Sequence, residues 1–401
     1  MERKIKHWIK KNVMKIALFA IIILGIVVRI SLRKFVSGDA KGFLIPWYKT
    51  IKSNGGLKGL GTQVGNYNIL YQFFIALFTY IPLNPLTVYK GFSSIFDFAL
   101  AALGVAYVKK VWKAEYWKEF MAFTCIFLSP VAILNSALWA QCDSIYSFFC
   151  IAVLLFLFKE QYWMAMIFLG IAFSFKMQAI FILPFVLLYY IVNEKFSIKY
   201  FGGTIISMIV LALPGVFCRR SVLDIVYIYK GQIQESSDWS FYNYPGFSNL
   251  FTNPESAIEH VRYTKSLCYI IAIAVIGCLC AWVIYKKIEM TRYNYTYLAF
   301  LVTYAGILFM PAMHERYGFI YEILAILIAV YDMKTIAGCL ALQLCSIITY
   351  SYYLFKFEYN IRALSIFNMV IFIGYLLYFI RKLKQDDNIK EKSANFTCGN
   401  L

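Results

Sequence analysis

Four short polar clusters interrupt the long apolar runs of this sequence. They are Ser37-Gly38-Asp39-Ala40, Trp139-Ala140-Gln141-Cys142-Asp143, Lys176-Met177-Gln178 and His314-Glu315-Arg316-Tyr317. A carboxylate such as Asp39 can act as a general base towards a hydroxyl group. Lys176 and Arg316 suit a phosphate, which the guanidinium of Arg316 can bind through two parallel hydrogen bonds. Together the clusters indicate a site for a phosphate and a hydroxyl-bearing substrate.

Each cluster also has a structural interpretation. Asp39 can cap a helix predicted over Phe43–Ile51, and 138–143 can form a polar turn between two helices. Lys176 can extend its amine to the lipid headgroups. The run His314-Glu315-Arg316 is the hardest to explain as a solvated loop, because it holds charges of both signs between two apolar runs. The other polar side chains are predicted to bind sugar hydroxyls or to orient the cations: Gln141, Asp143, His314 and Glu315.

The composition requires that these clusters belong to a membrane protein. Of the 401 residues, 61% are hydrophobic and 15% are charged, whereas a soluble domain has about 45–50% apolar and about 25% charged residues. This excludes a water-soluble enzyme, and the abundance of Phe and Tyr excludes low-complexity disorder. The net charge of +18 comes from short Lys/Arg clusters between apolar runs, which favours cytoplasmic loops over a nucleic-acid partner.

The spacing of these basic clusters predicts about twelve spans, within a range of eleven to thirteen. The basic segment Met1–Lys15 precedes the first span, Ile16–Val28, without a cleavage site, so the N-terminus is expected inside. A span over Asn68–Leu83 would place Lys109-Lys110-Val111-Trp112-Lys113 outside. We therefore assign Asn68–Leu83 to the outer face as an interfacial or re-entrant helix, followed by a second span over Leu86–Val108.

This topology gives one integral membrane domain over residues 1–401. Its large outer loops are 33–85, with interfacial helices, and 218–265, and residues 381–401 form a cytoplasmic tail. The four polar clusters then lie at the outer ends of different spans. Because a charge at membrane depth costs at least about 2.5–3.5 kcal/mol, ionisable groups there are candidates for function. We expect the clusters to converge into one outer-face site.

The same four clusters resemble motifs of the GT-C membrane glycosyltransferases. An early outer-loop acid, W-x-Q-x-D, K-x-Q and M-H-E-R-Y occur here between Ser37 and Tyr317. The sequence is most similar to bacterial relatives of the eukaryotic GPI second-mannose transferase, and dolichol-pathway glucosyltransferases are also similar. The resemblance implies an all-α GT-C-like fold and transfer of a hexose, mannose favoured, from a polyprenyl-phosphate sugar to a glycan or glycolipid acceptor. It implies inversion, no nucleotide donor and a reaction on the non-cytoplasmic side.

The resemblance also assigns roles to the polar residues. Asp39 takes the role of the catalytic base. Lys176, His314 and Arg316 take that of the donor phosphate site, and Gln178 joins the substrate-binding residues. Many relatives carry a Tyr-Pro-Pro element where this chain has Asn66-Tyr67-Asn68-Ile69. There is also no second acid beside Asp39, so a divalent metal is compatible with the sequence but not required by it, and we predict no metal ligands.

Other function classes share this hydropathy. A transporter or lipid flippase predicts broken helices with polar residues near mid-membrane and an internal repeat, and the sequence pattern indicates neither. A polyprenyl-linked polymerase or a membrane acyltransferase stays open, since His314 next to Glu315 would also suit acyl transfer. The Lys/Ile/Tyr/Asn-rich usage favours a bacterial plasma membrane over an ER membrane, with the site facing outside.

Overall fold

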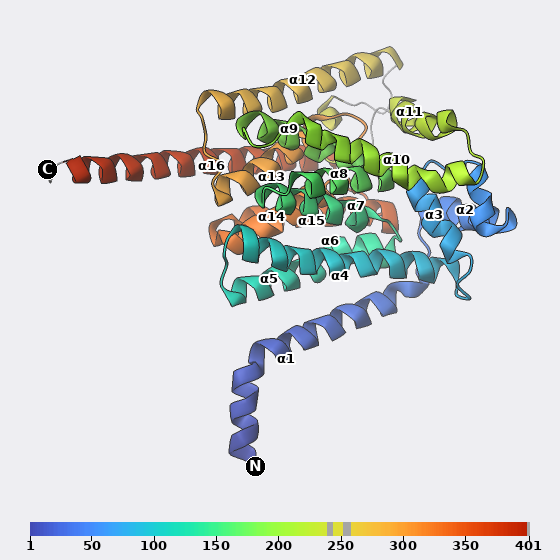
Figure 1. The fold of residues 1–401 in the computed structure, drawn as a ribbon, viewed down its shortest axis with the longest axis horizontal. Coiled ribbons are helices and arrows are strands. Elements are labelled where there is room, and N and C mark those ends of the chain that lie inside the picture. The colour runs from blue at the N-terminus through green and yellow to red at the C-terminus, as the bar shows by residue number, and fades with distance from the viewer. Residues whose placement is uncertain (239–243, 252–257, 399–401) are drawn as a thin grey trace.

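Helices form all the regular structure in the residues that the computed structural model describes, which are 1–238, 244–251 and 258–398 (Figure 1). This confirms the predicted all-α fold. The longer helices are α1 (Glu2–Ser31), α2 (Ile45–Ser53), α3 (Ile69–Phe78), α4 (Pro85–Val111), α5 (Tyr116–Phe127), α7 (Asp143–Phe158), α8 (Tyr162–Phe175), α9 (Leu183–Val192), α10 (Gly202–Phe217), α11 (Val222–Asp238), α12 (Ile258–Tyr285), α13 (Arg292–Phe309), α14 (Phe319–Tyr331), α15 (Ile336–Phe355) and α16 (Ile361–Cys398). Short helical pieces join them: η1 (Leu32–Lys34), η2 (Ala40–Leu44), η3 (Gly56–Gly61), α6 (Pro130–Ile133), η4 (Leu134–Leu138), η5 (Met177–Ile182), η6 (Ile198–Phe201), η7 (Phe247–Leu250) and η8 (Met333–Thr335).

Seven helical stretches in the described residues are long and apolar enough to cross a membrane. They are Glu2–Lys34, Pro85–Val111, Tyr116–Leu138, Ile198–Phe217, Arg262–Tyr285, Met333–Phe355 and Ile361–Asp386. Five shorter apolar helical stretches accompany them: Ile69–Phe78, Asp143–Phe158, Tyr162–Phe175, Met177–Val192 and Phe319–Tyr331. The chain is therefore a polytopic membrane protein, and the number of eleven to thirteen spans stays a prediction.

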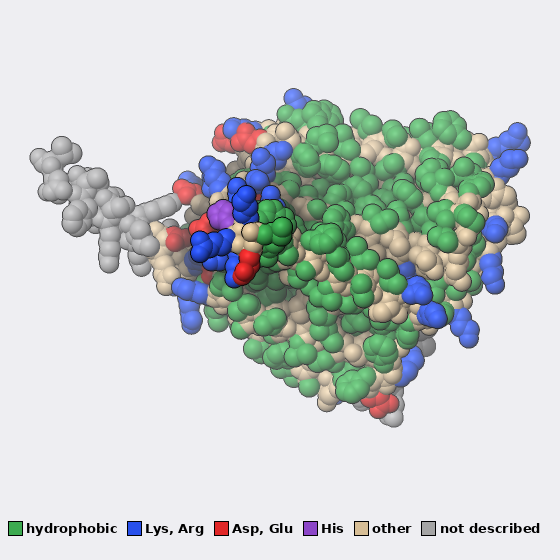
Figure 2. Space-filling model, turned by 90° about the horizontal axis from the view of Figure 1, so that it is seen from below, with side chains coloured by type: hydrophobic (Ala, Val, Ile, Leu, Met, Phe, Trp, Pro, Cys, Tyr) green, Lys and Arg blue, Asp and Glu red, His purple; other side chains and the backbone are tan. Residues whose placement is uncertain are grey.

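The central helices of the bundle are buried on all sides. Every residue from Tyr293 to Leu308 in α13 and from Phe319 to Val330 in α14 is buried. By contrast, only 11% of the apolar window of α1 and 17% of that of the α10 stretch are buried inside the protein. Figure 2 shows hydrophobic side chains across the middle of one face and charged side chains mainly at its two ends. An exposed apolar surface of this extent is what a bilayer covers.

The segment assigned to the outer face holds only a short helix. α3 has ten residues, about 15 Å of helix, which is too short to span a bilayer core of about 30 Å. Pro85 then begins α4, where Asn84 Oδ1 accepts a hydrogen bond from the Leu86 amide at 2.9 Å. Proline suits this first position because its missing N–H would have no helical partner. The structure thus agrees with a second long helix near the predicted Leu86–Val108, which starts at Pro85 and ends at Val111.

Two predicted loop regions contain more helix than expected. The 218–265 region includes α11 and the first turns of α12, and its residues 239–243 and 252–257 lie outside the described part. The 381–401 region continues α16 as far as Cys398. In Figure 1, α16 projects beyond the bundle at one end, whereas α2, α3 and α11 gather at the other end.

Candidate active site

Asp39 lies between α1 and α2. It precedes η2, and its carboxylate makes no capping hydrogen bond, so the interpretation of Asp39 as a helix cap is wrong. Instead Oδ2 accepts hydrogen bonds from Trp139 Nε1 at 3.0 Å and from Gln141 Nε2 at 2.5 Å. Oδ1 accepts one from the Tyr353 hydroxyl. The side chains of Trp139 and Gln141 therefore position the Asp39 carboxylate by hydrogen bonds.

A tight turn after η4 orients Trp139 and Gln141 towards Asp39. Ala140 has φ of 69°, in the left-handed region, which costs an L-residue roughly 1–2 kcal/mol. Two hydrogen bonds keep the turn in place: Gln141 N donates to Asn135 O at 2.9 Å, and Ser37 Oγ donates to Trp139 O at 2.8 Å. The Trp139 ring also stacks on Tyr353, with ring centroids 4.5 Å apart. This strained, buried backbone directs both donors towards Asp39.

The second carboxylate, Asp143, is the first residue of α7 and its side chain is fully buried. Its Oδ1 forms a salt bridge with Lys176 Nζ, and its Oδ2 accepts a hydrogen bond from Asn135 Nδ2 at 2.8 Å. Lys176 has extended backbone angles where α8 ends and η5 begins, and its side chain is 6% exposed. The interpretation of Lys176 as a cation that extends to the headgroups is therefore wrong, because its amine neutralises a buried acid.

Arg316 lies between the two carboxylates, in the loop that joins α13 to α14. Its Nη1 is 3.8 Å from Asp39 Oδ2, and its Nε is 3.6 Å from Asp143 Oδ2. These are ion pairs beyond hydrogen-bond distance, and the buried Nε has no hydrogen-bond partner among the described residues. Burial lowers the pKa of Arg316, but Asp143, Asp39 and Glu315 outweigh burial and raise that pKa. The guanidinium is therefore charged and has an uncommitted donor.

His314, Glu315 and Gln178 lie around Arg316 and Tyr317. Glu315 Oε1 is 3.7 Å from Arg316 Nη1, and its Oε2 is 3.9 Å from His314 Nδ1. Burial raises the pKa of Glu315, but His314 and Arg316 outweigh burial and lower it. Burial lowers the pKa of His314, so this imidazole is neutral at pH 7. Gln178 interacts with the Tyr317 hydroxyl.

The structure thus brings the four clusters together, as expected from their placement at one end of the helices. Asp39, Gln141, Asp143, Lys176 and Arg316 form a connected polar centre, and Glu315 and His314 adjoin Arg316. In the part of the chain that the structure describes, no group of three or more His, Cys, Asp or Glu residues is arranged to hold a metal ion. Lys176 and Arg316 lie next to the carboxylates, and Arg316 is the cation that keeps a donor for an anionic ligand.

The sequence analysis missed two residues that contact the site carboxylates. Tyr353, which donates to Asp39, lies in the apolar helix α15, where no pattern distinguishes it from neighbouring tyrosines. Asn135, which donates to Asp143, is a lone amide in the apolar run before Trp139. An amide inside an apolar run is itself a signal, because a polar group in lipid requires a partner.

A buried ion pair between Arg29 and Asp97 contacts η4, the element that precedes this turn. Asp97 of α4 accepts hydrogen bonds at Oδ2 from Arg29 Nη2 at 2.9 Å and Nε at 3.1 Å, and from Ser136 Oγ. Arg29 Nη2 also donates to Phe127 O at 2.8 Å. Ser136 belongs to η4, so the pair links α1 and α4 to the element that presents Trp139 and Gln141. Both charges lie in apolar runs of the sequence. Because a charge in such a run is costly in a membrane, its presence indicates either a function or a buried partner of opposite charge.

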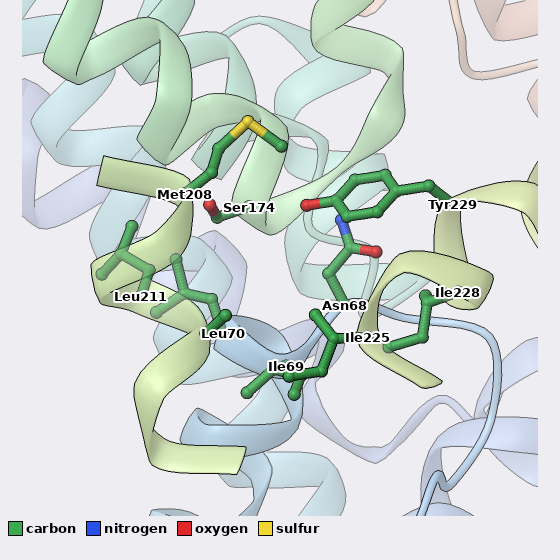
Figure 3. Close-up of a pocket in the computed structure, with 10 residues that line it drawn as sticks. Asn68, Ile69, Leu70, Ser174, Met208, Leu211, Ile225, Ile228 and Tyr229 are labelled. Atoms are coloured by element: carbon green, nitrogen blue, oxygen red, sulfur yellow. The ribbon is translucent and has the colours of Figure 1, made fainter. Parts of the chain in front are cut away.

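A small apolar pocket lies beside this centre, between α3, α8, α10 and α11 (Figure 3). Its volume is about 10 Å³, room for about one water molecule. Figure 3 shows the Tyr229 hydroxyl directed towards Ser174 and the Asn68 amide, with the aliphatic side chains on the other walls. None of the predicted site residues lines it.

No protein-family model and no curated protein matches this chain, so the assignment of function rests on the chemistry of this site.

Proposed function

We propose that the protein is a GT-C-type membrane glycosyltransferase, which transfers a hexose from a polyprenyl-phosphate sugar to a glycan or glycolipid acceptor. Mannose is the favoured hexose. The observation that carries this proposal is the pairing of Asp39 with Arg316, whose nearest side-chain atoms are 3.8 Å apart. A carboxylate that can take a proton thus stands next to a cation with a free donor, in a protein embedded in lipid. That pairing suits a hydroxyl nucleophile and a lipid-borne phosphate leaving group.

Asp39 retains the capacity to act as a base in this arrangement. Its Oδ1 accepts one hydrogen bond, from Tyr353, and a carboxylate oxygen has two lone pairs. The second lone pair is available to an acceptor hydroxyl. In the proposed reaction, Asp39 takes the hydroxyl proton as the oxygen forms a bond to the anomeric carbon from the side opposite the phosphate. The bond from that carbon to the phosphate oxygen breaks, and its electron pair leaves with the polyprenyl phosphate.

Arg316 is the cation best suited to the departing phosphate. Lys176 is committed to Asp143 through a direct salt bridge, whereas Arg316 has its three acidic neighbours at 3.6–3.8 Å. A fixed cation that meets charge developing on a leaving group is often the largest contribution to catalysis. We therefore assign Arg316 to the phosphate and Lys176 to the positioning of Asp143. Neutral His314 fits a hydrogen-bonding role.

The proposed topology places this reaction on the non-cytoplasmic face of a bacterial plasma membrane. If α7, α8, α13, α14 and the continuous stretch Met177–Val192, formed by η5 and α9, cross together with the seven longer stretches, the chain has twelve crossings. The segments that carry Asp39, Gln141, Lys176, Arg316 and Tyr353 then all lie at the ends opposite the N-terminus. This matches the span number and the outer-face site predicted from the basic clusters.

Donor turnover in lipid vesicles tests the proposal. The purified protein is supplied in turn with polyprenyl-phosphate mannose, glucose and galactose together with extracted membrane glycolipid, and consumption of each donor is followed. Asp39→Asn is expected to lower turnover of the accepted donor by about 10²–10⁴-fold, because the amide cannot take the proton. Asp224→Asn, at an exposed acid of α11, is the matched control and should retain turnover. Wild-type turnover by Asp39→Asn would remove Asp39 from the reaction, and no consumption of any donor would refute the proposed function.

A further inference from the structure

The N-terminal part of α1, residues 2–15, stands apart from the helix bundle. In Figure 1, α1 leaves the bundle and bends, so that its first part runs across the direction of the long helices. Its large apolar side chains are exposed, with Ile5 at 51%, Trp8 at 59%, Ile9 at 44% and Val13 at 55%. These exposed fractions show that the bundle does not cover this segment.

The segment is strongly amphipathic. Ile5, Trp8, Ile9 and Val13 follow the i, i+3, i+4, i+8 spacing that places residues on one face of a helix. The opposite side carries Arg3, Lys4, Lys10 and Lys11, and Lys6 and Lys15 lie at its two borders with the apolar face. Glu2 is the sole acid, and it pairs with Lys6 at 2.5 Å. The segment therefore has an uncovered apolar face and an excess of five positive charges.

A bilayer surface is the environment that fits both faces. Such a helix lies in the plane of the interface, with its apolar face about 5–10 Å into the headgroup region. The continuation of α1 is an apolar stretch long enough to cross the membrane, so residues 2–15 stand where that stretch meets the bilayer surface. Figure 2 shows Lys and Arg side chains gathered at this end, next to the apolar belt.

We propose that residues 2–15 form an in-plane anchor whose basic face binds the phosphates of anionic lipid headgroups. The choice of lipid over a protein partner follows from the position of the segment at the membrane boundary and from its charge. The anchor also bears on the site, because α1 has little cover along its length and is held near its other end by the Arg29–Asp97 pair. Fixing the first end of α1 at the bilayer surface sets the depth of the helix that leads to Asp39.

Hydrogen–deuterium exchange of the full-length protein in nanodiscs tests this proposal. We expect the amides of residues 2–15 to exchange more slowly in discs that contain phosphatidylglycerol than in discs of phosphatidylcholine alone. Each basic residue near an anionic surface raises the ratio of membrane-bound to unbound segment about fivefold. The triple variant Lys4→Gln, Lys10→Gln and Lys11→Gln should therefore lower that ratio by about a hundredfold and restore fast exchange.

Two controls separate this role from a general effect of charge. Arginine at the same three positions keeps the charge and should retain slow exchange. Glutamine in place of Lys109, Lys110 and Lys113, which are exposed cations at the end of α4, should leave exchange of residues 2–15 unchanged. Equal exchange in the two kinds of disc, or slow exchange retained by the Gln variant, would overturn the proposal. The readout requires no glycosyl transfer, so its outcome is independent of the proposed function.

Discussion

Breaking the buried Arg29–Asp97 pair is expected to destabilise the protein far more than removing both charges. The side chains are 7% and 0% exposed. Arg29 donates twice to Asp97 Oδ2, once to Phe127 O and once, at 3.2 Å, to Gly25 O. In Arg29→Met, Asp97 would keep only hydroxyl groups as hydrogen-bond partners, those of Ser136 and Ser144, and its charge would have no counter-ion.

The expected magnitude follows from the cost of a buried charge without a partner. Removing one member of a buried ion pair costs about 3–5 kcal/mol, whereas replacing both members by apolar residues is often neutral or stabilising. The double variant Arg29→Met with Asp97→Leu should therefore unfold within about 1 kcal/mol of the wild type. Ser136 tolerates the loss of Asp97 because its single O–H can donate instead to Ala132 O, which lies 3.0 Å away. The coupling free energy of the cycle is then about 3 kcal/mol or more.

The assay is reversible unfolding of the four proteins in mixed micelles, followed by tryptophan fluorescence. Lys90→Met is the matched control, because Lys90 is a buried cation of α4 that donates to the carbonyls of Leu32 and Phe35 and forms no salt bridge with another described residue. Its loss leaves no charge behind and should cost less than Arg29→Met. The reasoning would be refuted if Arg29→Met were as stable as the wild type. It would also be refuted if the losses of unfolding free energy in the two single variants added up in the double variant.

Two further substitutions test the site and the opposite end of the bundle. Tyr353→Phe removes the hydroxyl that donates to Asp39 Oδ1, and because a hydrogen bond to a charged group is worth about 1.5–3 kcal/mol, kcat should fall by about tenfold or more. Tyr352→Phe, a neighbour without a recorded contact to Asp39, should not change kcat, and an unaltered kcat in Tyr353→Phe would contradict the assigned contact. Asp332, between α14 and α15, accepts hydrogen bonds from Lys382 Nζ at 2.7 Å and the Tyr378 hydroxyl at 2.8 Å. Burial raises the pKa of Asp332, but these two contacts outweigh burial, so the net effect is a lowered pKa. A lowered acid pKa stabilises the fold above the unfolded value of about 4, and this contribution is lost as pH falls through the folded pKa. Asp332→Asn should therefore cost about 1 kcal/mol near pH 7 and flatten the acid side of the stability profile, whereas Asp386→Asn, at an exposed acid of α16, should leave that profile unchanged.

The sequence predicted the all-helical membrane fold and the meeting of the clusters because both follow from simple constraints. Apolar runs must be helical in lipid, and chain reversal brings alternate run ends to one side. That reasoning placed Asp39, Gln141, Asp143 and Arg316 together without any knowledge of packing. It also assigned Asn68–Leu83 to an interfacial or re-entrant helix, and the structure has a ten-residue helix there, α3, with seven residues buried in the protein.

The partners of individual side chains were beyond this reasoning, because they depend on which helices pack together. Lys176 and Asp143 are 33 positions apart, and their contact required α7 and α8 to pack side by side. Tyr353 is one of 32 tyrosines, so its residue type alone did not single it out. Arg29 and Asp97 differ from these cases, since each is a charge in an apolar run and could have been marked as one half of a buried pair.

The charges of the site explain why its two cations need not act alike. Asp143 keeps Lys176 and Asn135 even when Arg316 moves, so Arg316 can turn to a donor phosphate without leaving Asp143 unpaired. Lys176 has no such freedom, because its departure would strand Asp143. Movement of Arg316 would also take a cation away from Asp39, 3.8 Å distant, while the hydrogen bonds from Trp139, Gln141 and Tyr353 stay in place. In the proposed reaction, donor binding would therefore leave Asp39 correctly held and more ready to take the acceptor proton, which couples the arrival of the leaving group to the activation of the nucleophile.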